Sequence, residues 1–136
     1  MMGAPAAGIP YWRLSSFYFL YYAFLGAMMP YWSLYLQAVG LDAAAIGVVL
    51  AVMAAIRIVA PNLWGWLADR SGRRLLIIRT GAFAALIAFA ALLVRTDLWW
   101  LVAVVALHSV FWNAILAQYE VITLSLIHIS EPTRPY

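Results

Sequence analysis

Cysteine and lysine are both absent from this chain of 136 residues, and charged residues make up only 10% of it. The lack of cysteine excludes disulfide bonds and thiol chemistry. Hydrophobic residues account for 68% of the chain, which leaves too little polar surface to coat a soluble globule of this size. The scarcity of charge therefore predicts an integral membrane protein, and the lipid bilayer is its first expected partner.

Residues that could form a catalytic or metal site are scarce as well. No phosphate-binding glycine loop occurs, and no nucleophile, base and orienting residue stand at useful spacing. Neither histidine belongs to a group of residues with the spacing of a metal site. We therefore expect no enzyme, no metal site and no cofactor. The net charge of +3 comes from arginines near the expected membrane boundaries, so nucleic acid is not expected as a partner.

Four apolar segments are each long enough to cross a bilayer, which takes about 20 residues of helix. They cover approximately residues 15–36, 46–67, 75–94 and 98–123. Because lipid cannot satisfy backbone amides, these segments are expected to be helices and not open strands. The predicted fold class is an all-α membrane protein with four transmembrane helices. Residues 1–14 are expected to form a short cytoplasmic lead, and Asp42 is expected to cap the second helix.

The arginines near the ends of the spans predict the orientation of the chain. One side of the membrane receives Arg13, Arg70, Arg73, Arg74 and Arg79, and the other receives Arg95 alone. Cytoplasmic loops carry the excess of Lys and Arg in membrane proteins. The N-terminus and the loop between the second and third spans are therefore expected in the cytoplasm.

Polar residues within or beside the apolar segments form the candidate pathway for a solute and for protons: Tyr22, Arg57, His108, Asn113 and Glu120. Arg57 lies near the middle of the second span, where a charge costs about 2.5–3.5 kcal/mol. Leu67 is about 15 Å further along the helix, so Arg57 is too deep for comfortable snorkelling to the cytoplasmic surface. Arg57 could bind an anionic substrate or a proton-carrying carboxylate, or it could form a structural ion pair.

The other candidates have structural alternatives. Glu120 is expected on the same helix face as Asn113, where the pair could serve a central pathway, or it marks the cytoplasmic end of the helix. His108 could relay protons because imidazole titrates near neutral pH, or it could bond to a neighbouring helix. Tyr22 belongs to an aromatic first span that could form a pore wall or anchor at the interface. Pro61 is expected to interrupt the second helix and to permit a kink.

Small residues recur at helical spacing in the second and third spans. They form two stripes: Gly47, Ala51 and Ala55, and then Gly81, Ala85 and Ala88. Such stripes let helix backbones approach closely in lipid. The alternative is that they only reflect an alanine-rich sequence, and both interpretations stay open.

The chain changes in character after residue 123, because alanine and tryptophan no longer occur. The stretch from Leu124 to Arg134 matches the translation of a transposase-type sequencing-library adapter. We therefore predict that residues 124–136 are a non-native tail. The alternative is an ordinary amphipathic C-terminal segment. The charge arguments do not depend on the tail, since removing Glu131 and Arg134 leaves seven arginines against four acids.

The loop between the second and third spans resembles a signature of the major facilitator superfamily, Gly-x-Leu-Ala-Asp-Arg-x-Gly-Arg-Arg. The matching residues are Gly65, Leu67, Ala68, Asp69, Arg70, Gly72, Arg73 and Arg74. The resemblance implies that Gly65 permits close helix packing and that Asp69 joins a charge network at a helix end. It also implies that the arginines, Arg73 among them, hold an inward gate.

The resemblance also implies a larger protein. Residues 15–123 would be the first four helices of a twelve-helix transporter, and the C-terminal half would be a missing partner. A wider stretch, with Pro30-Tyr31-Trp32, Gly40-Leu41 and Arg57, looks like the sugar, nucleoside and phenylpropionate permease branch of the superfamily. The expected function is secondary transport of a small organic solute by alternating access, coupled to protons, in a bacterial inner membrane. The alternatives are a complete four-helix protein acting as a homo-oligomeric exporter or channel, and a non-transporting membrane scaffold.

Overall fold

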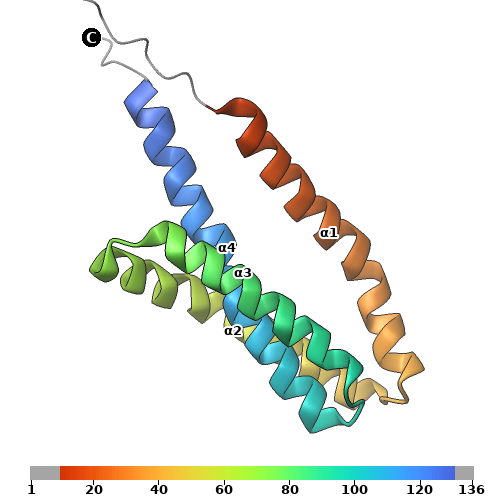
Figure 1. The fold of residues 1–136 in the computed structure, drawn as a ribbon. Coiled ribbons are helices and arrows are strands. Elements are labelled where there is room, and N and C mark those ends of the chain that lie inside the picture. Colours follow the sequence, from red (N-terminus) through yellow and green to blue (C-terminus); the bar gives the residue numbers. More distant parts are fainter. Residues whose placement is uncertain (1–9, 131–136) are drawn as a thin grey trace, which may run out of the picture.

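The computed structural model describes residues 10–130, and this part of the chain contains helices and no strands. The elements are α1 Tyr11–Ala38, α2 Ala43–Ser71, α3 Arg74–Ala90, the 3₁₀ turn η1 Ala91–Leu93 and α4 Leu98–Ser130 (Figure 1). The all-α prediction is confirmed. Every predicted segment is helical, but α1 begins before residue 15 and α4 continues beyond residue 123. The third span ends in the 3₁₀ turn.

Among residues 10–130, three stretches are long and apolar enough to cross a membrane: Ala43–Ser71, Arg74–Leu93 and Leu98–His128. The prediction of four spans is corrected on this point, because α1 is not among them. Tyrosine, tryptophan and serine are frequent in α1, and their polar atoms lower its mean hydropathy relative to the other helices. A transmembrane α1 therefore remains a proposal.

The helices of the bundle are joined by short connections with defined caps. The Asp42 carboxylate accepts a hydrogen bond from the Ala45 amide at 2.8 Å, so the predicted N-cap of α2 is confirmed. At the other end of α2, Gly72 has a φ of 65°, a left-handed conformation that favours glycine. Its N–H donates to the Ala68 carbonyl at 2.9 Å. Only Gly72 and Arg73 separate α2 from α3, so the second helix turns directly into the third.

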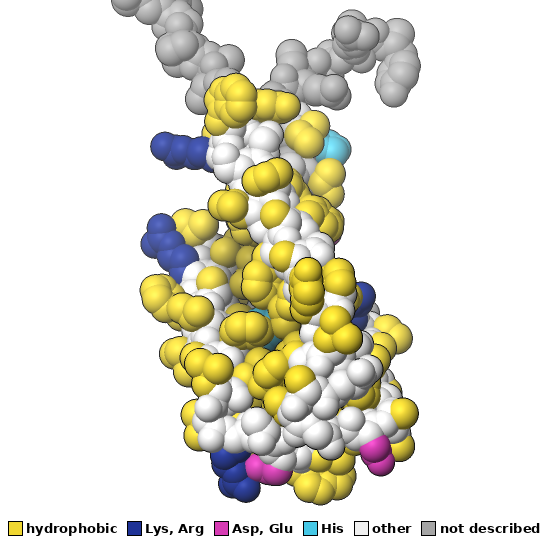
Figure 2. Space-filling model, turned by 90° about the vertical axis from the view of Figure 1, so that its right-hand side faces the viewer, with side chains coloured by type: hydrophobic (Ala, Val, Ile, Leu, Met, Phe, Trp, Pro, Cys, Tyr) yellow, Lys and Arg dark blue, Asp and Glu magenta, His cyan; other side chains and the backbone are white. Residues whose placement is uncertain are grey.

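Helix α4 packs against both α2 and α3, whereas α1 stands apart from them along much of its length (Figure 1). The larger apolar core lies where α1 leads into α2 and where η1 leads into α4. It consists of Trp32, Leu36, Ile46, Val49, Leu92, Leu101, Val104 and Val105. This core anchors the C-terminal end of α1 to the bundle. Hydrophobic side chains are spread along the whole length of the face shown in Figure 2, as expected for a surface in contact with lipid.

Within the described part of the chain, only one of the two small-residue stripes is a packing seam. The stripe that begins at Gly81 is buried along α3. A Cβ atom on Gly81 would lie 3.4 Å from the Phe111 carbonyl oxygen and 3.5 Å from the Ala114 Cβ. The stripe that begins at Gly47 is exposed, and a Cβ on Gly47 would meet no atom within 4 Å. The close approach of α3 to α4 therefore depends on small side chains in α3.

We predict that Gly81→Leu lowers the free energy of unfolding by about 1–3 kcal/mol, because the added side chain must displace the backbone of α4. Titration with sodium dodecyl sulfate, followed by circular dichroism, measures the change. The matched control is Gly47→Leu, which is expected to stay within about 0.5 kcal/mol of the parent protein. Equal losses in the two variants would contradict the assignment of the seam.

Candidate functional site

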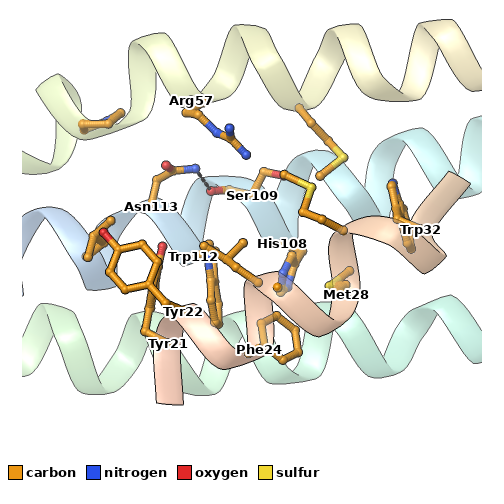
Figure 3. Close-up of a pocket in the computed structure, with 16 residues that line it drawn as sticks. Tyr21, Tyr22, Phe24, Met28, Trp32, Arg57, His108, Ser109, Trp112 and Asn113 are labelled. Atoms are coloured by element: carbon orange, nitrogen blue, oxygen red, sulfur yellow. Dashed lines mark hydrogen bonds between the residues drawn. The ribbon is translucent and has the colours of Figure 1, made fainter. Parts of the chain in front are cut away.

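A cavity of about 640 Å³ lies between α1, α2 and α4 (Figure 3). This volume is within the range of sites that bind small molecules. Polar groups enter the cavity from all three helices: Tyr22 from α1, Arg57 from α2, and His108, Ser109 and Asn113 from α4. Four of the five residues predicted for the solute pathway are thus brought to one space from three separate helices. Sequence reasoning missed Ser109.

The Arg57 side chain reaches from α2 toward the part of α4 that carries Ser109 and Asn113 (Figure 3). Both ion pairs found within residues 10–130 involve other arginines. Arg57 forms no hydrogen bond with any described residue either. The structural ion pair that was one alternative for Arg57 is therefore not made within the described part of the chain. The positive charge instead faces the cavity.

Proline occurs one turn beyond a cavity-lining residue in both α1 and α2. Helix α2 continues through Pro61 without the predicted interruption, and Pro61 itself lines the cavity. Because proline has no backbone N–H, the Arg57 carbonyl lacks its usual helical donor. Pro30 removes the donor of the Gly26 carbonyl in α1 in the same way, and Gly26 also lines the cavity. The two helices therefore each have one carbonyl group available for other hydrogen bonds.

Hydrogen bonds to carbonyl oxygens orient His108 and Asn113 on α4. The His108 Nδ1 lies 3.0 Å from the Ala85 carbonyl oxygen of α3. A carbonyl only accepts, so Nδ1 carries the proton and Nε2 of the neutral ring is an acceptor. The Asn113 Nδ2 donates to the Ser109 carbonyl at 2.7 Å. His108 thus makes the helix-to-helix bond that was one of its two predicted roles, and it also lines the cavity.

Aromatic side chains hold α1 against α4 on one side of the cavity. Phe17 stacks on Tyr119 with ring centroids 3.5 Å apart, and Tyr21 stacks on Trp112 at 4.7 Å. Phe24 also contacts the Trp112 ring, at 4.9 Å. Each such pair stabilises the fold by about 0.5–1.5 kcal/mol, in addition to the stabilisation from the burial of its apolar surface. The sequence showed the rings of α1 but had no signal for their partners on α4, since a ring-to-ring contact leaves no motif.

Glu120 does not line the cavity. It is exposed, and it forms no hydrogen bond or ion pair with the residues from 10 to 130. Asn113, two turns earlier on α4, does line the cavity. The structure therefore places these two candidates of the predicted pathway in different surroundings.

Arg74, the first residue of α3, connects the α2–α3 hairpin to α4. Its guanidinium pairs with the Asp69 carboxylate of α2 and donates to the Gln118 Oε1 of α4 at 2.8 Å. Gln118 is completely buried, whereas the Asp69 side chain is 70% exposed. The bond to Gln118 is therefore the one shielded from water. The resemblance gave the gate role to the arginines of the loop, with Arg73 singled out, and the structure places Arg74 beside Asp69.

The comparison with protein-family models gives a match to the MFS_1 like family over residues 11–136. The chain belongs to the MFS_1 like family. The resemblance to the major facilitator superfamily is thereby confirmed, and this superfamily consists of transporters and not of enzymes. Together with the three apolar helices, the match shows a multi-pass membrane protein. No curated protein and no solved structure matches the sequence.

The match to the MFS_1 like family includes residues 124–136, and their interpretation as a non-native tail stays a prediction.

Besides Asp69 and Arg74, other residues of the signature loop make local contacts. The Arg70 guanidinium lies 5.5 Å from the centroid of the Trp66 ring, within the range of a cation–π contact. A Cβ on Gly65 would meet no atom within 4 Å, so the close packing implied for Gly65 has no counterpart in the described part of the chain.

Gln118 contacts the α2–α3 hairpin, and the sequence did not reveal it, since a single glutamine in an apolar helix carries no motif. Its Oε1 accepts from Arg74, while its Nε2 has no partner among residues 10–130. A buried amide with an unpaired donor is costly. Its burial at the end of the hairpin makes it sensitive to any movement of Arg74.

We predict that Arg74→Ala lowers the free energy of unfolding by about 1–3 kcal/mol, because it leaves both polar atoms of the Gln118 amide unpaired. The double variant with Gln118→Leu should recover much of this loss, since leucine needs no hydrogen bond. Detergent titration measures all three proteins. Arg73→Ala is the control and should change stability by no more than about 0.5 kcal/mol. A loss in Arg73→Ala as large as that in Arg74→Ala would contradict the role of Arg74.

Proposed function

We propose that this chain forms part of a secondary transporter that moves a small organic solute through the cavity between α1, α2 and α4. The observation that carries the proposal is the convergence of Arg57, His108 and Asn113 on one space of about 640 Å³. Ionisable residues inside membrane spans are costly, and they commonly mark substrate and ion pathways. In transporters of this superfamily the binding site also lies near the bilayer midplane, at the interface between repeats.

The α2–α3 hairpin supplies a gate for this pathway. It lies at the opposite end of the bundle from the connection between α1 and α2 (Figure 1). Arg74 joins Asp69 on α2 to Gln118 on α4, so breaking these bonds would release the hairpin from α4. Alternating access requires one group of helices to rock against another. We propose that the bonds of Arg74 form and break as the cytoplasmic end closes and opens.

Protons are the proposed coupling ion. His108 lies in the cavity, and its Nε2 is available to accept a proton once Nδ1 is bound to the Ala85 carbonyl. Glu120 offers a second titratable group further along α4. Histidine is the side chain that most readily changes charge near neutral pH. These two residues are the proposed proton carriers of the described segment.

We predict that the uninterrupted gene encodes about eight further spans after residue 123, because transporters of this superfamily contain two halves of six helices. The full-length product, reconstituted in liposomes, should exchange a labelled solute from a panel of sugars, nucleosides and carboxylates. Arg57→Ala should reduce that exchange. A stop codon soon after residue 123 would favour the homo-oligomeric four-helix protein, and an absence of exchange for every solute would favour the scaffold.

We also predict that the α2–α3 hairpin faces the cytoplasm of a bacterial inner membrane. Arg70, Arg73 and Arg74 lie at this end, whereas Arg95 pairs with Asp97 at the other. A reporter inserted after Gly72 should show the activity of a cytoplasmic β-galactosidase. The same reporter inserted at residue 96 is the control and should be inactive, while alkaline phosphatase should be active there. Phosphatase activity after Gly72 would contradict this orientation.

A further inference from the structure

Arg57 faces the cavity as a cation that no described carboxylate neutralises. The acidic residues of the described part are engaged or lie elsewhere: Asp42 caps α2, Asp69 pairs with Arg74, Asp97 pairs with Arg95, and Glu120 is exposed outside the cavity. An arginine within a membrane span is stabilised by a negative partner or by a wet cavity. A bound anion would supply such a partner.

A hydroxyl group on the neighbouring helix adds a second donor. Ser109 is only 6% exposed and lines the cavity, and its side chain makes no hydrogen bond within residues 10–130. The Arg57 guanidinium extends toward this part of α4 (Figure 3). A planar guanidinium and a hydroxyl on the wall of the same cavity match the oxygen atoms of a carboxylate, which can accept several hydrogen bonds at once.

The rest of the cavity wall limits what the remainder of the solute can be. Apart from Tyr22, His108 and Asn113, it is built largely from apolar and aromatic side chains, including Phe24, Met28, Met53, Trp112 and Leu116. These side chains offer few hydrogen-bond partners to a polyhydroxyl solute such as a sugar. They favour an apolar body, because burying polar groups without partners is unfavourable.

We infer that the solute is an organic monocarboxylate with an apolar body, and that its carboxylate is held by Arg57 and Ser109. The inference rests on the proposed transport function and names the substrate class of the same cavity. Arg57 provides the charge and Ser109 provides a neutral donor. The apolar wall contributes affinity in proportion to the buried area of the solute.

The test compares carboxylates with their uncharged amides of the same shape. Butyrate, butyramide, hexanoate and hexanamide are titrated calorimetrically into the full-length protein in lipid nanodiscs, with empty nanodiscs as the blank. Each carboxylate should bind at least about tenfold more tightly than its amide, since a charge-assisted pair adds roughly 1.4 kcal/mol or more. Arg57→Gln should abolish this preference, Arg57→Lys should keep part of it, and Ser109→Ala should weaken carboxylate binding several-fold.

The matched control is Arg79→Gln, which removes an exposed arginine of α3 that does not line the cavity. It should leave the preference unchanged. Equal binding of acid and amide, a preference that survives Arg57→Gln, or no binding of either carboxylate at millimolar concentration would overturn the inference. Circular dichroism and the elution volume establish that each variant is folded before titration.

The transport experiment separates this inference from the proposed function. Exchange of neutral solutes together with equal binding of acid and amide would overturn the inference and leave the proposed function standing. Binding of carboxylates that depends on Arg57, without exchange of any solute, would support the inference and overturn transport.

Discussion

Hydrocarbon offers no hydrogen-bond partners, so a polar group inside the bundle is stable when it pairs within the protein or faces a cavity. The Nδ1 of His108 and the Nδ2 of Asn113 pair with carbonyl oxygens. Arg74, at a helix end, pairs with a carboxylate and a buried amide. Arg57 has no such partner among the described residues and lies on the cavity. This one constraint therefore separates the polar groups that pair within the protein from those, Arg57 and Ser109, that line the cavity without a partner among the described residues.

The cavity exists because α1 meets α4 through side chains and not through its backbone. Small residues around Gly81 bring α3 close to α4, whereas stacked rings such as Tyr21 on Trp112 keep α1 at a distance. Aromatic side chains are large and rigid, so they can hold two helices together without closing the space beside them. Helix α4 thus faces a dense seam on one side and the cavity on another. Helix α4 also carries Gln118, which accepts a hydrogen bond from Arg74 of the α2–α3 hairpin.

Much of the fold was predictable, because spanning segments must be helical and because caps have local signatures. The Asp42 cap and the short connection at Gly72 follow from residue type alone. The predicted span at residues 15–36 was not confirmed, because the aromatic residues of α1 combine apolar rings with polar atoms. Within the candidate site, the depth of Arg57 was evident, but the contact of Asp69 with Arg74 was not. Adjacent residues of a motif point in different directions on a helix, and a motif cannot tell which one reaches its partner.

The sequence by itself determined that this is a helical membrane protein of the major facilitator type, because long apolar segments and a charged glycine-rich loop are local properties of the chain. Tertiary structure decided which polar residues share a cavity, which stripe of small residues packs, and which arginine meets Asp69. These depend on the distance and rotation between helices. Packing among all the side chains sets both quantities, and no short stretch of sequence contains them.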